Sequence, residues 1–183
     1  LDDLIAALCI QKNYAFFRGS EDDVLSRYYQ VATRYNADVV VRVTSDCPLI
    51  PSGIISKHIN TAIYNKHDYV NNVDERCRSI ADGFDCEILS MKAMKWLEQN
   101  ATSKDEKEHV TIALRKNTPP KELKCGFIKP QLDTFDIKLV SDRLKLSIDT
   151  KEDLEYLRNF YHNREFKKNM AITLYGRENI YEY

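Results

Sequence analysis

The sequence predicts a layered α/β fold, in which a mostly parallel sheet is flanked by helices. Segments with the apolar period of helices alternate along the chain with short β-branched runs. The run at residues 39–44 does not alternate between apolar and polar side chains, which is typical of a parallel strand covered on both faces. The 183 residues suit one domain. We place it at residues 1–162, followed by a C-terminal extension at 163–183.

In the first half of the chain we expect three helices and two strands. Ser20 lies three residues before Asp23, which is the capping-box pattern that opens a helix. Pro48 and Pro51 interrupt the chain after the apolar run. The expected elements, in order, are a helix over 4–13, a strand at 15–17, a helix opened by Ser20, the strand 39–44 and a helix over 54–63.

The second half of the chain continues this alternation. Ser103 with Glu106 and Thr150 with Asp153 are two further capping boxes. Residues 121–142 are expected to bear strands and are a candidate contact between two copies of the chain, as in a homodimer. The other expected elements are a strand over 85–90, a helix through Trp96, a helix from Ser103 towards Arg115, a strand over 144–148 and a helix from Thr150 to Phe160.

Composition argues against several classes of protein. With 27 basic and 28 acidic residues the net charge is −1, which lacks the basic excess that holds proteins on nucleic acid. No apolar run approaches the roughly 20 residues that span a membrane. The five cysteines form no Cys-x-x-Cys pair, which favours reduced thiols in the cytoplasm. The five glycines are isolated, so no glycine-rich loop for a triphosphate is present.

Two acidic residues follow predicted strands. Asp46 lies two residues beyond the strand 39–44, and Asp149 comes directly after the strand 144–148. In open α/β sheets ligands bind beyond the carboxyl ends of strands. Two carboxylates that meet there suit Mg²⁺, which takes its other ligands from phosphate and water. The alternative is that Asp46 begins a turn and Asp149 caps a helix.

Other polar residues are open to two interpretations. The segment 82–85 (Asp-Gly-Phe-Asp) is either a turn or a loop whose glycine lets a ligand approach while the acids accept its hydroxyls. Arg42 is a single charge in an apolar strand, and an acid or a phosphate would serve as its partner. Lys107 and His109 belong either to a solvated helical face or to the edge of an anionic pocket.

Six motifs occur in order over residues 1–160. They are residues 17–25 with 27–29, then 41–50, 69–72, 82–87, 108–111 and 148–154. Together they resemble the cytidylyltransferase family of spore-coat and surface polysaccharide synthesis, which is related to the CMP-sugar-acid synthetases. The resemblance implies a glycosyltransferase-A-like α/β fold. It also implies an enzyme that transfers CMP from CTP to a sugar, with release of pyrophosphate.

The resemblance assigns roles to individual residues. It implies that Asp46 and Asp149 are catalytic and hold Mg²⁺, the same pair that the strand ends indicate. It places Gly19, Ser20, Glu21, Arg42 and Ser45 on the nucleotide side. It places Asp82, Gly83, Asp85, Lys107, Glu108 and His109 on the sugar side.

The chain departs from the family at its start and within some motifs. The family begins with a strand, a basic glycine-containing loop and a helix, whereas this chain starts at Leu1, without Met, after those elements. We therefore expect an N-terminally truncated fragment. Pro51 replaces a usual Asp and Ile112 a usual Pro, which bears on the choice of sugar.

Two other functions remain open. A degenerate or truncated homologue would lack catalysis and act as a binding or assembly module. A glycosyltransferase of similar fold would carry a compact Asp-x-Asp motif, whereas Asp46 is followed by Cys47 and Pro48.

Overall fold

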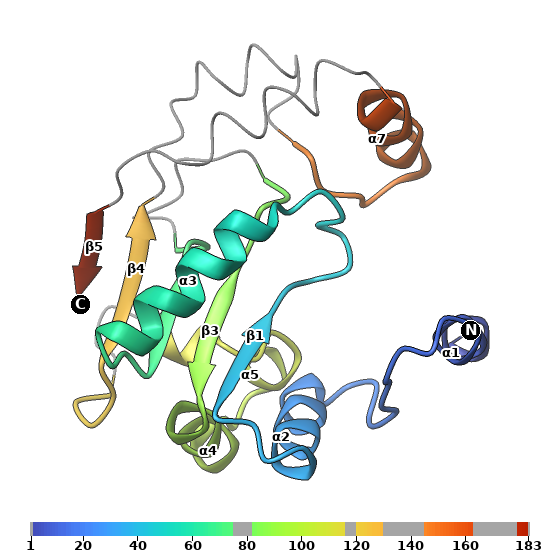
Figure 1. Cartoon of the computed structure of the whole chain (residues 1–183). Coiled ribbons are helices and arrows are strands. Elements are labelled where there is room, and N and C mark those ends of the chain that lie inside the picture. The colour runs from blue at the N-terminus through green and yellow to red at the C-terminus, as the bar shows by residue number, and fades with distance from the viewer. Residues whose placement is uncertain (1, 75–81, 116–119, 130–144, 163–178, 183) are drawn as a thin grey trace.

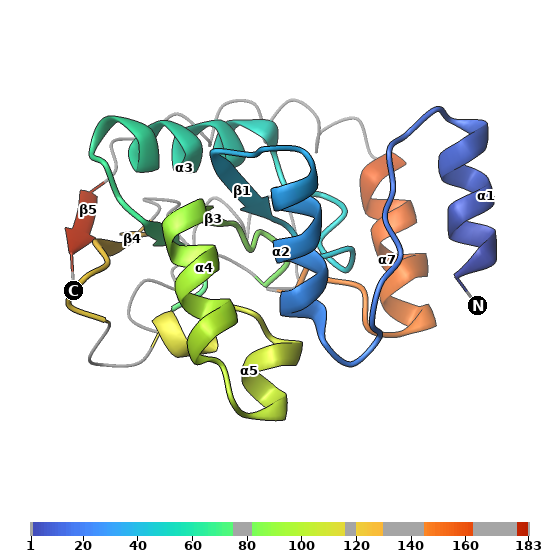
Figure 2. The ribbon, with the colours of Figure 1, turned by 90° about the horizontal axis from the view of Figure 1, so that it is seen from below.

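The layered α/β fold is confirmed in the computed structural model, which describes residues 2–74, 82–115, 120–129, 145–162 and 179–182. Figure 1 shows a sheet with helix α3 (Ser52–Tyr64) on one face, and Figure 2 shows α2 (Val24–Arg34), α4 (Met91–Asn100) and α5 (Lys104–Glu108) on the opposite face. The other helices are α1 (Asp3–Gln11), the 3₁₀ helix η1 (Ile112–Leu114) and α7 (Lys151–His162).

The described strands form a five-stranded mixed sheet in the order β1-β3-β2-β4-β5. They are β1 (Val39–Arg42), β2 (Tyr69–Asn71), β3 (Glu87–Ser90), β4 (Cys125–Lys129) and β5 (Asn179–Glu182). Strand β3 is antiparallel to both β1 and β2, β2 is parallel to β4, and β5 is antiparallel to β4. Three strands therefore share one direction, but neighbouring pairs are mostly antiparallel, which corrects the expected mostly parallel sheet.

Strand β1 lies at the edge of the described sheet and pairs with β3 alone among the described strands. Val41 is 36% exposed, and the other three residues of the strand are half-buried. The prediction that residues 39–44 are covered on both faces is therefore wrong. A run of β-branched residues favours extended backbone at an edge as well as in the centre of a sheet.

The helix caps follow the sequence at two of three sites. Ser103 and Glu106 form a complete capping box at α5. The hydroxyl of Thr150 accepts from the Asp153 amide at 3.1 Å, and the Asp153 carboxylate accepts from the Thr150 amide at 3.1 Å. At α2 the cap is instead Asp23, while Ser20 accepts from the Asp23 amide ahead of the helix.

Three expected elements differ in the structure. Residues 15–17 are irregular rather than a strand. The helix that begins after Ser103 ends at Glu108, and η1 follows it, because Val110 is left-handed with φ 59°. In the segment 144–148, Lys145 makes only an isolated bridge with Asp82, and residue 144 lies outside the described residues. Residues 130–144 and 163–178 also lie outside them, so the homodimer contact expected over 121–142 stays a prediction.

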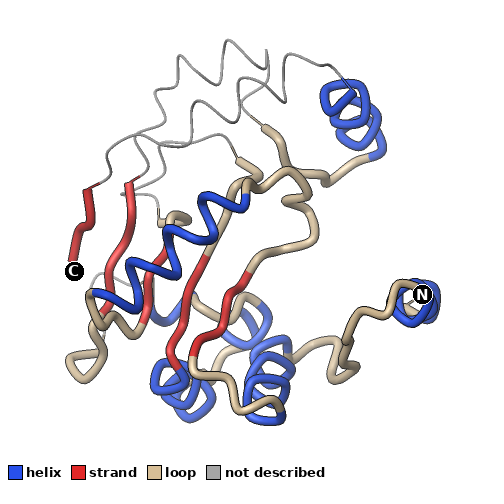
Figure 3. Tube along the Cα trace, in the orientation of Figure 1, coloured by secondary structure: helices blue, strands red, loops and turns tan. Residues whose placement is uncertain are grey.

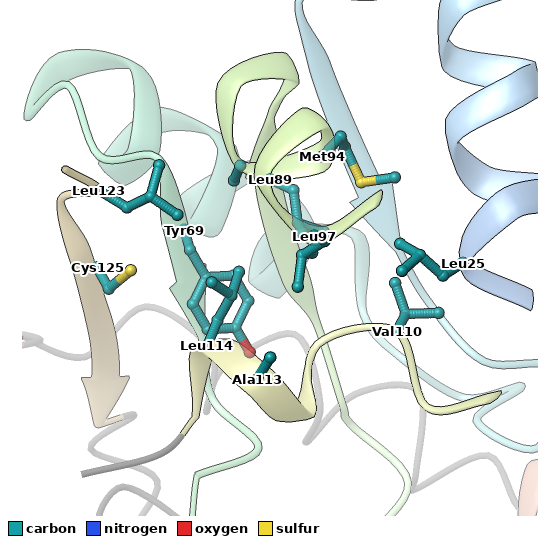
Figure 4. Packing of buried hydrophobic residues seen from close by; sticks show 11 residues of the cluster. Leu25, Tyr69, Leu89, Met94, Leu97, Val110, Ala113, Leu114, Leu123 and Cys125 are labelled. Carbon is teal, nitrogen blue, oxygen red and sulfur yellow. The ribbon is translucent and has the colours of Figure 1, made fainter. Parts of the chain in front are cut away.

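Alternate residues of the strands supply two apolar clusters, one on each face of the sheet. Val70 and Ile88 pack with Ile54 of α3 and Leu157 of α7. Tyr69 and Leu89 belong to the other cluster, which Figure 4 shows and which also contains Leu25, Met94, Leu97, Val110 and Leu114. Each large side chain that is fully buried contributes about 1.5–3 kcal/mol. The two clusters hold the sheet rigid beneath the loops at its end. None of the helices described is sufficiently long and apolar to pass through a membrane.

Candidate active site

Three loops meet at the end of the sheet where β1 finishes, and Figure 3 shows them in tan around the end of the strands. They are residues 43–50 after β1, 82–86 before β3 and 145–150 before α7. The Ile148 amide donates to the Asp46 carbonyl at 2.8 Å, and the Leu146 amide donates to the Asp82 carbonyl at 2.6 Å. The segment 145–148 therefore fastens the other two loops to each other.

This junction brings the backbones of Asp46 and Asp149 together, because Ile148 directly precedes Asp149. Asp46 is half-buried, and the side chain of Asp149 is 58% exposed. The Asp149 carboxylate is paired with Lys145, whose Nζ lies 2.7 Å from Asp149 Oδ2 and 2.7 Å from Asp153 Oδ2. These two carboxylates raise the pKa of Lys145. Asp46 and Asp149, the two acids predicted from the sequence, thus lie at the same edge of the sheet, and Lys145 is paired with Asp149.

The donor set at this edge is compatible with Mg²⁺ in kind and number. Within the described ranges, no three His, Cys, Asp or Glu side chains are grouped as a metal site. Mg²⁺ needs only one or two protein carboxylates when phosphate and water complete its shell. Asp46 and Asp149 would offer two hard oxygen ligands from adjacent loops, and a cation would compete with Lys145 for Asp149.

The loop at Asp82 and Gly83 is shaped by the chain itself. Gly83 has φ +113°, and a Cβ there would lie 2.4 Å from the carbonyl carbon of Leu146. The close approach that this glycine permits is therefore that of the Leu146 backbone, whereas one of the two interpretations left open by the sequence was the approach of a ligand. Ser147 Oγ donates to Asp82 Oδ2 at 2.7 Å and fixes this carboxylate. Asp85, on the same loop, is half-buried.

Two asparagines support the loops, and sequence analysis gave them no role beyond motif membership. Asn72 Nδ2 donates to the Phe84 carbonyl at 2.9 Å, and Asn72 Oδ1 accepts from the Cys86 amide at 2.8 Å. Asn71 Oδ1 accepts from the amides of residues 73 and 74. A buried amide side chain can satisfy a donor and an acceptor at once, which identifies paired asparagines at a strand end as loop supports.

Arg42 has an acid as its partner, one of the two alternatives left open by the sequence. Its Nη1 lies 2.5 Å from Oε2 of Glu87, which is 1% exposed. Burial opposes the charge on Arg42, but Glu87 together with Tyr28 and Tyr69 more than offsets it, so the pKa of Arg42 is raised. Oε1 of Glu87 accepts from Tyr69 and Thr111, each at 2.6 Å. Glu87 was not predicted as a site residue. It carries the same sequence signal as Arg42, because each is a single charge in an apolar strand.

The segments assigned to the nucleotide side and the sugar side come together at the start of α2. Lys107 Nζ lies 3.5 Å from the carboxylate of Asp23, which caps α2 directly after residues 19–22. Lys107 is therefore paired within the chain, while Glu108 and His109 are exposed. Gly19 lies beside Arg27, and Glu21 and Ser45 are exposed.

A groove of about 600 Å³ lies beside β1. Its walls come from α2, from the segment 15–17 and from the exposed edge of β1. The lining is mainly apolar and aromatic and contains none of the predicted site residues. The polar chemistry of the described chain is thus at the three loops rather than in this groove.

Comparison with known proteins gives the family. The model of the cytidylyltransferase family matches residues 1–178. The chain belongs to the cytidylyltransferase family. This confirms the resemblance seen in the six motifs and the nucleotidyltransferase-like fold.

Individual members of the family show how far the similarity extends. The chain is 32% identical over 170 residues to an uncharacterised protein of Methanocaldococcus jannaschii, covering 85% of this chain and 68% of that protein. It is 26% identical over 182 residues to the spore coat polysaccharide biosynthesis protein SpsF of Bacillus subtilis, covering 96% and 70%. The structure of a cytidylyltransferase from Leptospira borgpetersenii matches with a TM-score of 0.69 and 26% identity, covering 96% of this chain and 75% of that one.

Proposed function

We propose that the protein transfers CMP from CTP to a sugar for a cell-surface polysaccharide. The observation that carries this proposal is the hydrogen bond from the Ile148 amide to the Asp46 carbonyl, which sets Asp46 and Asp149 on neighbouring loops. Membership of the family supports the reaction class. The role in spore coat polysaccharide biosynthesis given for the Bacillus subtilis relative supports the sugar as acceptor.

In this reaction a sugar hydroxyl attacks the α-phosphorus of CTP, and the bond to the leaving oxygen breaks as pyrophosphate departs. Asp46 and Asp149 would hold Mg²⁺, which when bound neutralises charge on the triphosphate. Lys145 would keep its contact with Asp153 when Asp149 turns to the ion, because it is paired with both carboxylates. Asp153 also accepts from the Asp149 amide at 3.1 Å and so fixes the direction of this loop.

We assign the sugar side to acids and a histidine near the three loops. Carboxylates accept hydrogen bonds from sugar hydroxyls, and Asp82, Asp85 and Glu108 offer such groups. Exposed His109 adds a ring nitrogen. We keep Gly19, Ser20, Glu21 and Ser45 on the nucleotide side. We remove Arg42 from the residues that bind the nucleotide, because its guanidinium is paired with Glu87 within the chain.

Pyrophosphate release by the complete gene product tests the proposal. The assay combines CTP, Mg²⁺ and a panel of sugars and sugar acids. We expect Asp46→Asn and Asp149→Asn each to lower turnover by about 10²–10³-fold, as the loss of a group that stabilises developing charge does. Exposed Glu98 on α4 gives the control Glu98→Gln, which should retain activity. Turnover of either aspartate variant at the level of this control would contradict the two-acid site.

A binding or assembly module is the second candidate, and one observation favours it. The ion pair between Lys145 and Asp149 neutralises one of the two acids. Calorimetry with CTP and Mg²⁺ tests this candidate, since tight binding of CTP would count against a module that has lost the triphosphate site. We also propose a cytoplasmic location, which the free thiols of Cys47, Cys86 and Cys125 support.

A further inference from the structure

Glu87 is a buried carboxylate at the end of β3 where the three loops meet. It is 1% exposed and joins three separate parts of the fold. Arg42 Nη1 at the end of β1 lies 2.5 Å from its Oε2. Its Oε1 accepts from the hydroxyls of Tyr69 on β2 and of Thr111 between α5 and η1, each at 2.6 Å.

A buried ion pair is weak evidence for a role in stability alone. A buried ion pair carries a desolvation penalty, and apolar residues of similar volume often serve a core equally well. Burial and the Glu87 carboxylate raise the pKa of Tyr69 far above its usual value, so the phenol stays a donor. The Glu87 carboxylate is therefore held in place by the hydroxyls of Tyr69 and Thr111 and by the guanidinium of Arg42.

Thr111 connects this carboxylate to a strained turn. Val110, the residue before it, has φ 59° and is fully buried. Among the described residues, three others outside glycine have positive φ, namely Asn13, Asn36 and Lys66. Each lies two residues beyond the end of a helix, as Val110 does, but each is exposed whereas Val110 is buried. A β-branched residue is the least suited to this conformation.

Such strain persists only where the surroundings determine the backbone, and it is concentrated at functional sites. Here two contacts supply that determination. The Val110 side chain is buried in the cluster that Figure 4 shows, beside Leu25. The Thr111 hydroxyl is bound by Glu87, which acts from the other side of the turn. Exposed Glu108 ends α5 and exposed His109 is its C-cap, directly before the turn, so the turn fixes where this end of α5 joins the core.

We propose that Glu87 is a positioning residue for the sugar side of the site. Through Thr111 it fixes the turn that presents Glu108 and His109. Through Arg42 it fixes the end of β1, which leads to Asp46. The inference rests on the proposed function for its substrate, but the turn and its anchor are properties of the fold alone.

Thr111→Val is the test, because it keeps the shape of the side chain and removes the hydroxyl donor. Thr111→Ser restores the donor. Tyr69→Phe is the matched control, since it removes the other donor to the same Glu87 oxygen from β2 and leaves the bond between Thr111 and Glu87 in place. All three are compared for melting temperature and for the KM of the sugar, the KM of CTP and kcat.

We expect Thr111→Val to raise the KM of the sugar by about tenfold or more, with the KM of CTP changed by less than about twofold. Thr111→Ser should recover most of the loss, and Tyr69→Phe should lower the melting temperature while leaving the sugar KM near wild type. Equal effects of Thr111→Val and Tyr69→Phe on the sugar KM would overturn the proposal, because they would indicate a general loss of structure.

Hydrogen exchange keeps this test separate from the fate of the proposed function. If the wild-type protein releases no pyrophosphate with any sugar, the proposed function fails while the anchor can still be examined. Amides of residues 109–111 should exchange faster in Thr111→Val and at the wild-type rate in Tyr69→Phe. Unchanged exchange in Thr111→Val would show that Glu87 does not hold the turn.

Discussion

Gly83→Ala should be strongly destabilising, because the backbone of another loop occupies the space of the new methyl group. Its Cβ would lie 2.4 Å from the Leu146 carbonyl carbon, 2.6 Å from the Leu146 oxygen and 2.7 Å from the Ser147 amide nitrogen. These are backbone atoms, so no side chain can turn away. The φ of +113° adds a conformation that L-residues rarely adopt.

The magnitude follows from two contributions. Backbone strain of this kind costs about 1–3 kcal/mol. Movement of the loop also endangers the hydrogen bond from the Leu146 amide to the Asp82 carbonyl, which is worth about 1 kcal/mol. A loss of about 2–4 kcal/mol at about 2–4 °C per kcal/mol lowers the melting temperature by roughly 4–16 °C in a chain of this length.

Gly53→Ala is the matched control for calorimetric melting. Gly53 lies in α3, and apart from its chain neighbours and the backbone of its own helix no atom lies within 4 Å of a Cβ built there. Alanine is better than glycine in a helix by up to about 1 kcal/mol, so the control should be neutral or stabilising. If Gly83→Ala melts at the temperature of Gly53→Ala, the backbone of residues 145–147 does not pack closely against the loop 82–86. That result would contradict the described contact between the loops that support the site.

Two further predictions concern charge. Burial lowers the pKa of His58 from 6.5 to about 4, so the unfolded chain takes up a proton before the native protein does. The His58 contribution to the free energy of unfolding should be fully present above pH about 6.5 and should fall towards pH 4, with a loss of about 2.5 kcal/mol at pH 4.5. Urea unfolding should show this loss in wild type but not in His58→Leu. Equal pH dependence of the two proteins would contradict the prediction. Lys145→Met removes the competitor at Asp149, so calorimetry should show tighter Mn²⁺ binding by about two- to fivefold. Weaker binding would mean that Lys145 orders the site rather than competing with the ion.

The parts of the fold that were predictable depend on residues close in sequence. The capping boxes at Ser103 and Thr150 need only three-residue spacing, and both are present. The order of the strands was not predictable in this way, because β3 enters between β1 and β2 through contacts far apart in the chain. The left-handed Val110 was also not predictable, since a β-branched residue is the least suited to this conformation. The bond from the adjacent Thr111 hydroxyl to Glu87 joins residues far apart in the chain.

The candidate site was also predictable only in part. Strand-end reasoning brought Asp46 and Asp149 to one edge, because it needs only the direction of the chain at each position. It could not show that Lys145 pairs with Asp149 or that Arg42 pairs with Glu87, since these contacts depend on side-chain directions in three dimensions. Charged residues within apolar strands are the sequence signal that could have identified Glu87.

The central claim is that two carboxylates hold one divalent ion together with the phosphates of CTP. Electron paramagnetic resonance of Mn²⁺ with CTP and the complete protein measures this directly, through the spectrum of the protein-bound ion. We expect that signal with wild type and with Glu98→Gln, and its loss in both Asp46→Asn and Asp149→Asn. An unchanged signal in either aspartate variant would show that the ion is held elsewhere.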